Sequence, residues 1–197
     1  MQQPSTTTRL ELLAPAGNQE VALAAIDHGA DAVYIGAPQF SARANAGNSI
    51  ADIENVAKYA HRFRVKIYVA LNTILTDSEL PQALSIANQL YQAGVDGLII
   101  QDFGLVEAGL PPLPLIASTQ MHNASLEKIK FLEQVGFSRA ILARELSLKQ
   151  IQAIAKQTTI ELESFVHGSL CVSYSGQCYL SQAAFNRSGN RGVCAHA

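Results

Sequence analysis

Short apolar runs alternate along this chain with longer segments in which apolar residues recur at helical spacing. The apolar runs predict seven buried strands, at Leu10–Ala14, Ala32–Ile35, Lys66–Leu71, Gly97–Ile100, Leu115–Ala117, Ala140–Ala143 and Ile160–Val166. The segments between them predict six helices, at Gln19–His28, from Ser49 to about Phe63, at Asp77–Ala93, at about Phe103–Ala108, at Ser125–Val135, and from Ser147 to about Gln157. Strands that are apolar throughout are typical of a parallel sheet that helices cover.

Seven consecutive β/α units favour an α/β fold of the TIM-type (β/α) barrel class over an open doubly wound sheet. No G-x-G-x-x-G follows any strand, which counts against a dinucleotide-binding fold. A complete barrel has about eight strands, and the pattern gives no eighth strand before Ala197. We therefore expect a fragment of a longer protein. Its expected parts are a flexible tail at 1–8, a barrel portion at 9–167 and a cysteine-bearing loop segment at 168–197 that continues further.

Composition and charge narrow the function classes. Hydrophobic residues make up 48% of the chain and charged residues 15%, which is typical of a globular protein. The net charge of −2 offers no general attraction to nucleic acids or anionic membranes. The N-terminal stretch lacks the apolar core of a secretory signal, and no apolar run approaches the roughly 18 residues that cross a bilayer. We expect a cytoplasmic protein without membrane contact, in which disulfides are disfavoured.

Polar residues follow most of the predicted strands, at the end of a barrel where active sites lie. An arginine, an acid and a histidine around one mouth can bind an anionic or polar substrate and move protons. These features make Arg144, Glu145 and His167 the candidate catalytic residues. The candidate substrate-binding residues are Asn72, Gln101, Asp102 and Gln120 at strand ends, Arg43 and Asn45 in the loop after the second strand, and Arg187 and Arg191 near the last cysteine. Any one of these residues can instead begin a loop or cap a helix.

The three cysteines, Cys171, Cys178 and Cys194, stand within 24 residues, after 170 residues without a cysteine. Their spacings, Cys-x6-Cys and Cys-x15-Cys, match neither a zinc ribbon nor a ferredoxin run. Three unrelated small buried residues could show the same spacing. Their concentration in a Gly/Ser-rich segment favours a shared metal site. Three thiolates are too few for four-coordination, so a fourth ligand would come from His167, His196 or residues further on.

The cysteine-bearing segment resembles a known family. Its sequence contains ESFVHGSLC from Glu163, YSGQC from Tyr174 and RSGNRGVC from Arg187, and the N-terminal ELLAPAG and GADAVYIG also fit. From about Arg9 to its last residue, the chain resembles the collagenase-like peptidase family U-thirty-two. Within that family it looks most like the bacterial branch that forms 5-hydroxycytidine in large-subunit ribosomal RNA.

The resemblance implies an RNA-modifying hydroxylase with a four-iron iron–sulfur cluster. Cys171, Cys178 and Cys194 would hold the cluster, together with a fourth cysteine that relatives carry after the point where this chain stops. It also implies ribosomal RNA as substrate, prephenate as co-substrate and the iron–sulfur assembly machinery as a partner. A peptidase, as the family name says, and a non-catalytic iron–sulfur binding or assembly protein remain alternatives. The sequence contains neither a G-x-S-x-G nor an H-E-x-x-H motif, which counts against the peptidase.

Overall fold

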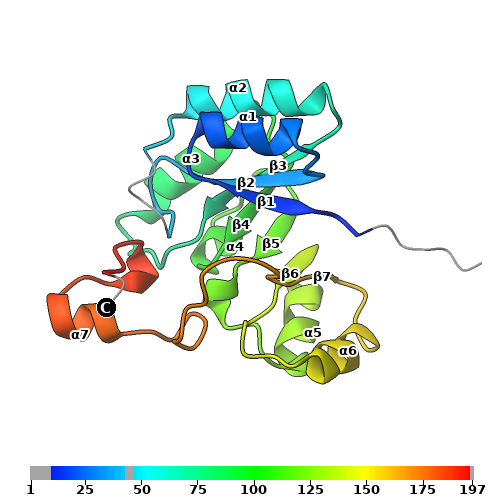
Figure 1. Ribbon diagram of the computed structural model, residues 1–197. Helices are drawn as coiled ribbons and strands as arrows, with labels where there is room; N and C mark the ends of the chain where they lie inside the picture. Colours follow the sequence, from blue (N-terminus) through cyan, green and yellow to red (C-terminus); the bar gives the residue numbers. More distant parts are fainter. Residues whose placement is uncertain (1–9, 43–46, 196–197) are drawn as a thin grey trace, which may run out of the picture.

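The computed structural model describes residues 10–42 and 47–195 (Figure 1). Seven parallel strands form one sheet in the sequential order β1 to β7. They are β1 (Leu13–Ala16), β2 (Ala32–Gly36), β3 (Lys66–Leu71), β4 (Gly97–Ile100), β5 (Leu115–Ala117), β6 (Arg139–Ile141) and β7 (Glu161–Glu163). The sheet curls into an incomplete barrel of the TIM type, so the predicted fold class is confirmed.

Helices follow the strands and cover the outer face of the sheet (Figure 1). They are α1 (Gln19–Asp27), α2 (Ile50–His61), α3 (Leu80–Gln92), α4 (Gly104–Glu107), α5 (Leu126–Val135), α6 (Leu148–Ala155) and α7 (Leu180–Phe185), with 3-10 turns η2 (Thr119–Met121) and η3 (Gly189–Arg191). No helix in residues 10–42 or 47–195 is long and apolar enough to span a membrane.

Local side-chain chemistry sets several helix starts. At α2 the hydroxyl of Ser49 accepts a hydrogen bond from the N–H of Asp52, and the Asp52 carboxylate accepts one from the N–H of Ser49. Ser147 and Gln150 make the same reciprocal pair at α6. Both pairs satisfy backbone donors that a helix start leaves without partners, which is why these helices begin where the sequence predicts.

The strands present alternate residues to opposite faces of the sheet. Outward residues such as Ile35 and Ile67 are fully buried in the main core against the helices. The inward residues form a smaller apolar cluster of Ala32, Tyr68, Ala70, Ile99, Ile116 and Ile141. This inner face forms the floor on which the site is built.

The two edge strands differ from their predicted bounds. β1 begins three residues later than predicted and includes Pro15, which lacks a backbone N–H and is tolerated because β1 pairs only with β2. β7 ends at Glu163, four residues before His167, so the predicted strand end near His167 is wrong. β7 has only the three-residue β6 to pair with, and Val166, 90% exposed, lies in the segment that has left the sheet.

The cysteine-bearing segment is also more regular than the predicted loop. After β7 the chain crosses the open side of the sheet and reaches α7 and η3, which lie beyond the loops that follow β2 and β3 (Figure 1). The N–H of Ile74 donates to the carbonyl of Asn190 at 3.1 Å, which joins η3 to the loop after β3. The segment is therefore attached to the barrel at both of its ends.

Candidate functional site

A cavity of about 920 Å³ opens on the inner face of the sheet, at the carboxyl ends of the strands. Its deep wall is formed by inward side chains of the strands, among them Tyr34, Ala70, Ile99 and Ile141. The segment from Ser164 to Ser173 forms the opposite wall. The cavity therefore joins the apolar floor of the barrel to the segment that carries the cysteines.

Several residues predicted for the site line this cavity. They are Asn72, Gln120, Arg144, His167, Cys171, Cys178 and Cys194, and they come from the loops after β3, β5 and β6 and from the chain after β7. Asn72 is 9% exposed; its Nδ2 donates to the hydroxyl of Ser118 at 3.0 Å and its Oδ1 accepts from the N–H of Ala42 at 2.9 Å. Asn72 thus joins three strand-end loops at the rim.

Other predicted residues have different surroundings. Asp102 accepts hydrogen bonds from the N–H groups of Leu75 and Gly104, both at 2.8 Å, and with Gln101 it lines a separate hollow. Glu145 and Arg187 do not line the main cavity. The two candidates Arg43 and Asn45 lie outside the described residues.

Arg191 does not line the main cavity and forms an ion pair with Glu79. Its guanidinium donates to both carboxylate oxygens of Glu79, at 2.6 and 3.1 Å, and to the carbonyl of Ile74 at 3.1 Å. The Arg191 guanidinium, with hydrogen bonds from Thr76, lowers the pKa of Glu79 to about 2. This contact attaches η3 to the start of α3.

Arg144 is the best-placed cation of the cavity. One of its Nη atoms donates to the carbonyl of Ser173 at 3.1 Å. Its Nε is buried and has no hydrogen-bond partner in the described parts of the chain. A buried guanidinium donor without a partner is costly, so this atom suits a hydrogen bond to an anionic or carbonyl oxygen of a bound molecule.

Ser175 holds the cysteine-bearing segment against the barrel. The serine is 1% exposed, its N–H and hydroxyl both donate to the carboxylate of Glu145, and its carbonyl lies 2.9 Å from Nδ1 of His122. Burial raises the pKa of Glu145, but the hydrogen bonds from Ser175 and the nearby Arg144 outweigh it and leave the pKa below its ordinary value. Glu145 is therefore an ionised anchor for this loop.

The chemistry of the cysteines favours a thiolate at Cys178. The hydroxyl of Ser173 and the backbone N–H groups of Leu180 and Ser181 lower the pKa of the Cys178 thiol. Cys194 has its sulfur 3.7 Å from the hydroxyl of Ser181. Within the described residues no three His, Cys, Asp or Glu side chains are grouped closely enough to hold a metal ion. The three cysteines line one cavity. Their sulfurs are not grouped around one point, as the predicted shared metal site requires.

The family described as Peptidase family U32 matches residues 17–197. This chain belongs to that family. The U32 chain is 55% identical over 189 residues to the Escherichia coli 23S rRNA 5-hydroxycytidine C2501 synthase, covering 96% of this chain and 29% of that relative. It is 36% identical to the Bacillus subtilis tRNA hydroxylation protein P1, covering 95% of this chain and 46% of the relative. The chain therefore spans less than half the length of these two relatives.

Two further relatives bear on the family name and on the fold. A collagenase of Porphyromonas gingivalis is 31% identical to the U32 chain, covering 94% of the chain and 48% of the relative. A solved U32 peptidase superposes with a TM-score of 0.67 at 16% identity, over 83% of this chain and 71% of the other. The thiamine phosphate pyrophosphorylase of Pyrococcus furiosus superposes with a TM-score of 0.56 at 14% identity, over 78% and 72%. These structural likenesses establish the barrel fold alone.

Sequence reasoning assigned no role to one acid of this U32 cavity. Glu163 lines the cavity wall, and burial raises its pKa to about 7, against the opposing effect of Arg139. A signal was available, because Glu161 and Glu163 are two acids, two residues apart, within a predicted buried strand. The register of β6 and β7 pairs Glu163 with Ile141, an inward residue, which explains why this acid faces inward.

Proposed function

We propose that this U32 chain is the barrel part of an enzyme that hydroxylates cytidine in large-subunit ribosomal RNA. The observation that carries the proposal is the 55% identity, over 96% of the chain, to the 23S rRNA 5-hydroxycytidine synthase of Escherichia coli. Relatives at 36% and 38% identity are named for tRNA hydroxylation, which is the same class of chemistry. Ribosomal RNA is accordingly the proposed partner and the cytoplasm the proposed location.

The cavity suits a single extruded nucleotide. Enzymes that modify a base take it out of the stack into a pocket, where it contacts apolar walls and a few polar groups. The volume of about 920 Å³ lies within the range of small-molecule sites, and Asn72, Gln120 and Arg144 supply polar groups at its rim. Arg144 suits the carboxylate of a co-substrate such as prephenate, and His167 suits proton movement at the mouth.

The cysteines suit an iron–sulfur cluster. Cys171, Cys178 and Cys194 would hold it, with a fourth ligand from elsewhere, because all three line one cavity and the pKa of Cys178 is lowered toward the thiolate that iron requires. Such a cluster, when bound, supplies electrons at the site, and its insertion makes the iron–sulfur assembly machinery a partner. Iron and sulfide analysis of anaerobically purified full-length protein, with each cysteine changed to serine in turn, tests this part. Full retention in Cys171→Ser or Cys178→Ser would remove that residue from the ligand set.

A peptidase is the second candidate, favoured by the 31% identity to a collagenase. A cysteine peptidase needs one thiolate with a base in hydrogen-bond reach. Three cysteines that share a cavity suit a cluster better than a single nucleophile.

The deciding experiment measures modified nucleosides. A bacterial strain without the full-length gene is complemented with it, and 5-hydroxycytidine in purified 23S rRNA is quantified by mass spectrometry. The proposal expects loss of the nucleoside in the deletion strain and recovery with the wild-type gene. An RNA profile unchanged by deletion, together with gelatin cleavage by the purified protein, would establish the peptidase instead.

A further inference from the structure

The hollow that Asp102 lines is a second space beside the main cavity, with a volume of about 410 Å³. Its wall comes from the loops after β3, β4 and β5, from α5 and from the cysteine-bearing segment. Gln177 and Tyr179 line this second hollow, whereas Cys178 between them lines the main cavity. Gln120 lines both spaces. A bound chain that fills the main cavity can therefore continue directly into the second hollow.

Lys128, on α5, is the cation of the second hollow. Its side chain is half-buried, and its Nζ donates to the backbone carbonyl of Met121, which lines the same wall. Within residues 10–42 and 47–195, no carboxylate lies within ion-pair distance of this ammonium. Burial lowers the pKa of Lys128, which is the effect of desolvation without a compensating charge. An anion in the hollow would supply that charge, and the ammonium keeps further N–H donors for it.

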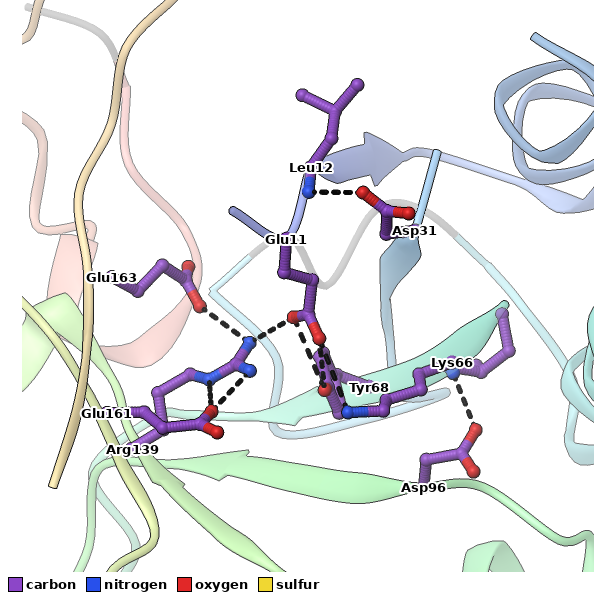
Figure 2. A network of polar contacts seen from close by, with 10 residues as sticks. Glu11, Leu12, Asp31, Lys66, Tyr68, Asp96, Arg139, Glu161 and Glu163 are labelled. Atoms are coloured by element: carbon purple, nitrogen blue, oxygen red, sulfur yellow. Dashed lines mark hydrogen bonds and ion pairs between the residues drawn. The ribbon is translucent and has the colours of Figure 1, made fainter. Parts of the chain in front are cut away.

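The cations inside the barrel differ from Lys128, because they have acidic partners (Figure 2). Arg139 is 8% exposed and donates to Glu11 at 2.6 Å and to Glu161 at 2.9 and 2.6 Å. Lys66 also reaches Glu11, at 3.3 Å. Those cations are neutralised within the protein, whereas the charge of Lys128 remains available to a bound molecule.

The acid of the second hollow is engaged elsewhere. The two carboxylate oxygens of Asp102 accept hydrogen bonds from the N–H groups of Leu75 and Gly104, both at 2.8 Å. These bonds tie the loops after β3 and β4 together and stabilise the charge of the carboxylate. Asp102 thus has a structural role and does not neutralise Lys128.

Two aromatic residues complete the wall of the second hollow. Phe103 is held by the edges of Phe131 and Phe137, with ring centroids 5.8 and 6.0 Å apart. Tyr179 is 61% exposed, and its ring has no aromatic partner among the described residues. Exposed aromatic rings beside a cation are typical of sites for single-stranded nucleic acid, because every base has a face that can stack.

We propose that the second hollow binds the nucleotide next to the one in the main cavity, with Lys128 on the phosphate that links the two and Tyr179 stacked on the neighbouring base. This inference rests on the proposed function. Enzymes that extrude one base also contact the nucleotides that flank it. Stacking and a phosphate contact tolerate any sequence, so this hollow supplies affinity and register and leaves the choice of base to the main cavity.

The test uses full-length protein prepared anaerobically and short single-stranded RNA probes with a central cytidine. In two modified probes an uncharged methylphosphonate replaces the phosphate on the 5′ side or the 3′ side of that cytidine. Fluorescence anisotropy measures each Kd. For the wild type we expect one of the two replacements to weaken binding about tenfold, as the loss of a charge-assisted hydrogen bond does.

A substitution of the lysine makes the test specific. Lys128→Gln should bind the unmodified probe about tenfold more weakly, and the same methylphosphonate should then weaken binding less than about twofold, because its partner is gone. Lys130→Gln is the matched control. Lys130 is an exposed lysine of the same helix that lines neither space, so this variant should keep the wild-type response.

The role of Tyr179 is tested with a probe that is abasic at the neighbouring position. The wild type should prefer the probe with the base about tenfold, and Tyr179→Phe should keep that preference because its ring stacks equally well. Tyr179→Ala should lose it. An unchanged preference in Tyr179→Ala would exclude the stacking contact.

The outcomes separate this inference from the proposed function. Equal binding of the charged and uncharged probes by the wild type, or an undiminished methylphosphonate effect in Lys128→Gln, would overturn the inference. The first comparison needs no variant and decides by itself if circular dichroism shows that Lys128→Gln does not fold. The proposed function fails on a different result, which is 23S rRNA whose 5-hydroxycytidine is independent of the gene.

Discussion

Gly176 lies so close to the carbonyl group of Gln120 that no side chain fits between them. Gly176 also has a φ of +72°, in the left-handed region that favours glycine. It lies between Ser175, which is anchored on Glu145, and Cys178 on the cavity wall. Since Gln120 lines the same cavity, this contact sets the position of the cysteine-bearing segment relative to the loop after β5.

Replacing Gly176 by alanine should therefore displace the segment 171–178. The clash is with backbone atoms, which cannot rotate away, so we expect a loss larger than the roughly 1 kcal/mol cost of the left-handed conformation alone. Hydrogen exchange of peptides covering 171–178 measures the displacement. Gly29→Ala is the matched control, because Gly29 has a φ of +93° and no atom within 4 Å of the position that an added Cβ would take. Equal exchange in the two variants would contradict the steric role of Gly176.

The anchor on Glu145 predicts a pH-dependent loop. The pKa of Glu145 in the folded protein lies below its ordinary 4.5, so its contribution to stability is complete above pH 4.5 and lost as the pH falls through the lowered value. Protection against exchange in the segment around Ser175, measured relative to the intrinsic exchange rate at each pH, should fall below pH 4.5 in the wild type. Glu145→Gln should show low protection in this segment already at pH 7. If the variant kept the wild-type protection at pH 7, Glu145 would not be the anchor.

The pair of Arg191 and Glu79 should hold η3 against the start of α3. Arg191→Glu should free the chain near Asn190 and increase its cleavage in limited proteolysis, because two carboxylates then face each other. The double variant Glu79→Arg with Arg191→Glu should recover part of the protection. The wild-type contact should weaken as the pH falls from 4.5 toward the Glu79 pKa of about 2. Equal cleavage in the single and double variants would show that the pairing of charges is irrelevant.

Arg139→Ala should destabilise the barrel by about 3 kcal/mol, since it leaves the partly buried Glu163 without a cation and Glu11 with Lys66 as its remaining cation. The loss in the free energy of unfolding should be smaller at pH 5 than at pH 8, because a protonated Glu163 needs no cation. Urea unfolding at both pH values measures it. Glu161→Gln should change stability by less than about 1 kcal/mol, because that carboxylate is largely exposed. A loss that does not vary with pH would exclude the acids as its cause.

Arg144→Ala should abolish hydroxylation in the full-length protein and leave the fold intact. Its Nε is a buried donor available to a bound molecule, whereas its structural contact is a single hydrogen bond to Ser173. Mass spectrometry of 23S rRNA nucleosides and circular dichroism measure the two effects. Lys149→Ala, at an exposed position on α6, removes a positive charge of the same region and should leave modification unchanged. Normal modification in Arg144→Ala would exclude a role for this arginine.

The sequence by itself determined the elements that depend on neighbouring residues. Apolar runs such as Lys66–Leu71 and Gly97–Ile100 became strands with those bounds, because burial on both faces requires continuous apolar residues. Ser49 and Ser147 became helix caps, because a cap is completed within three residues. The order of the strands followed from short connections between successive units.

Only the tertiary structure decided which polar strand-end residues face the cavity. Arg191 lies 112 positions from Glu79, and Asp102 is paired with an N–H 27 positions away, so no local pattern could reveal those partners. The end of β7 at Glu163 depended on how many residues β6 offered for pairing. The inward direction of Glu163 followed from its register against Ile141. A local pattern specifies an element, but the partner of a charged side chain is set by the packing of distant segments, because charge interactions depend on distance in space.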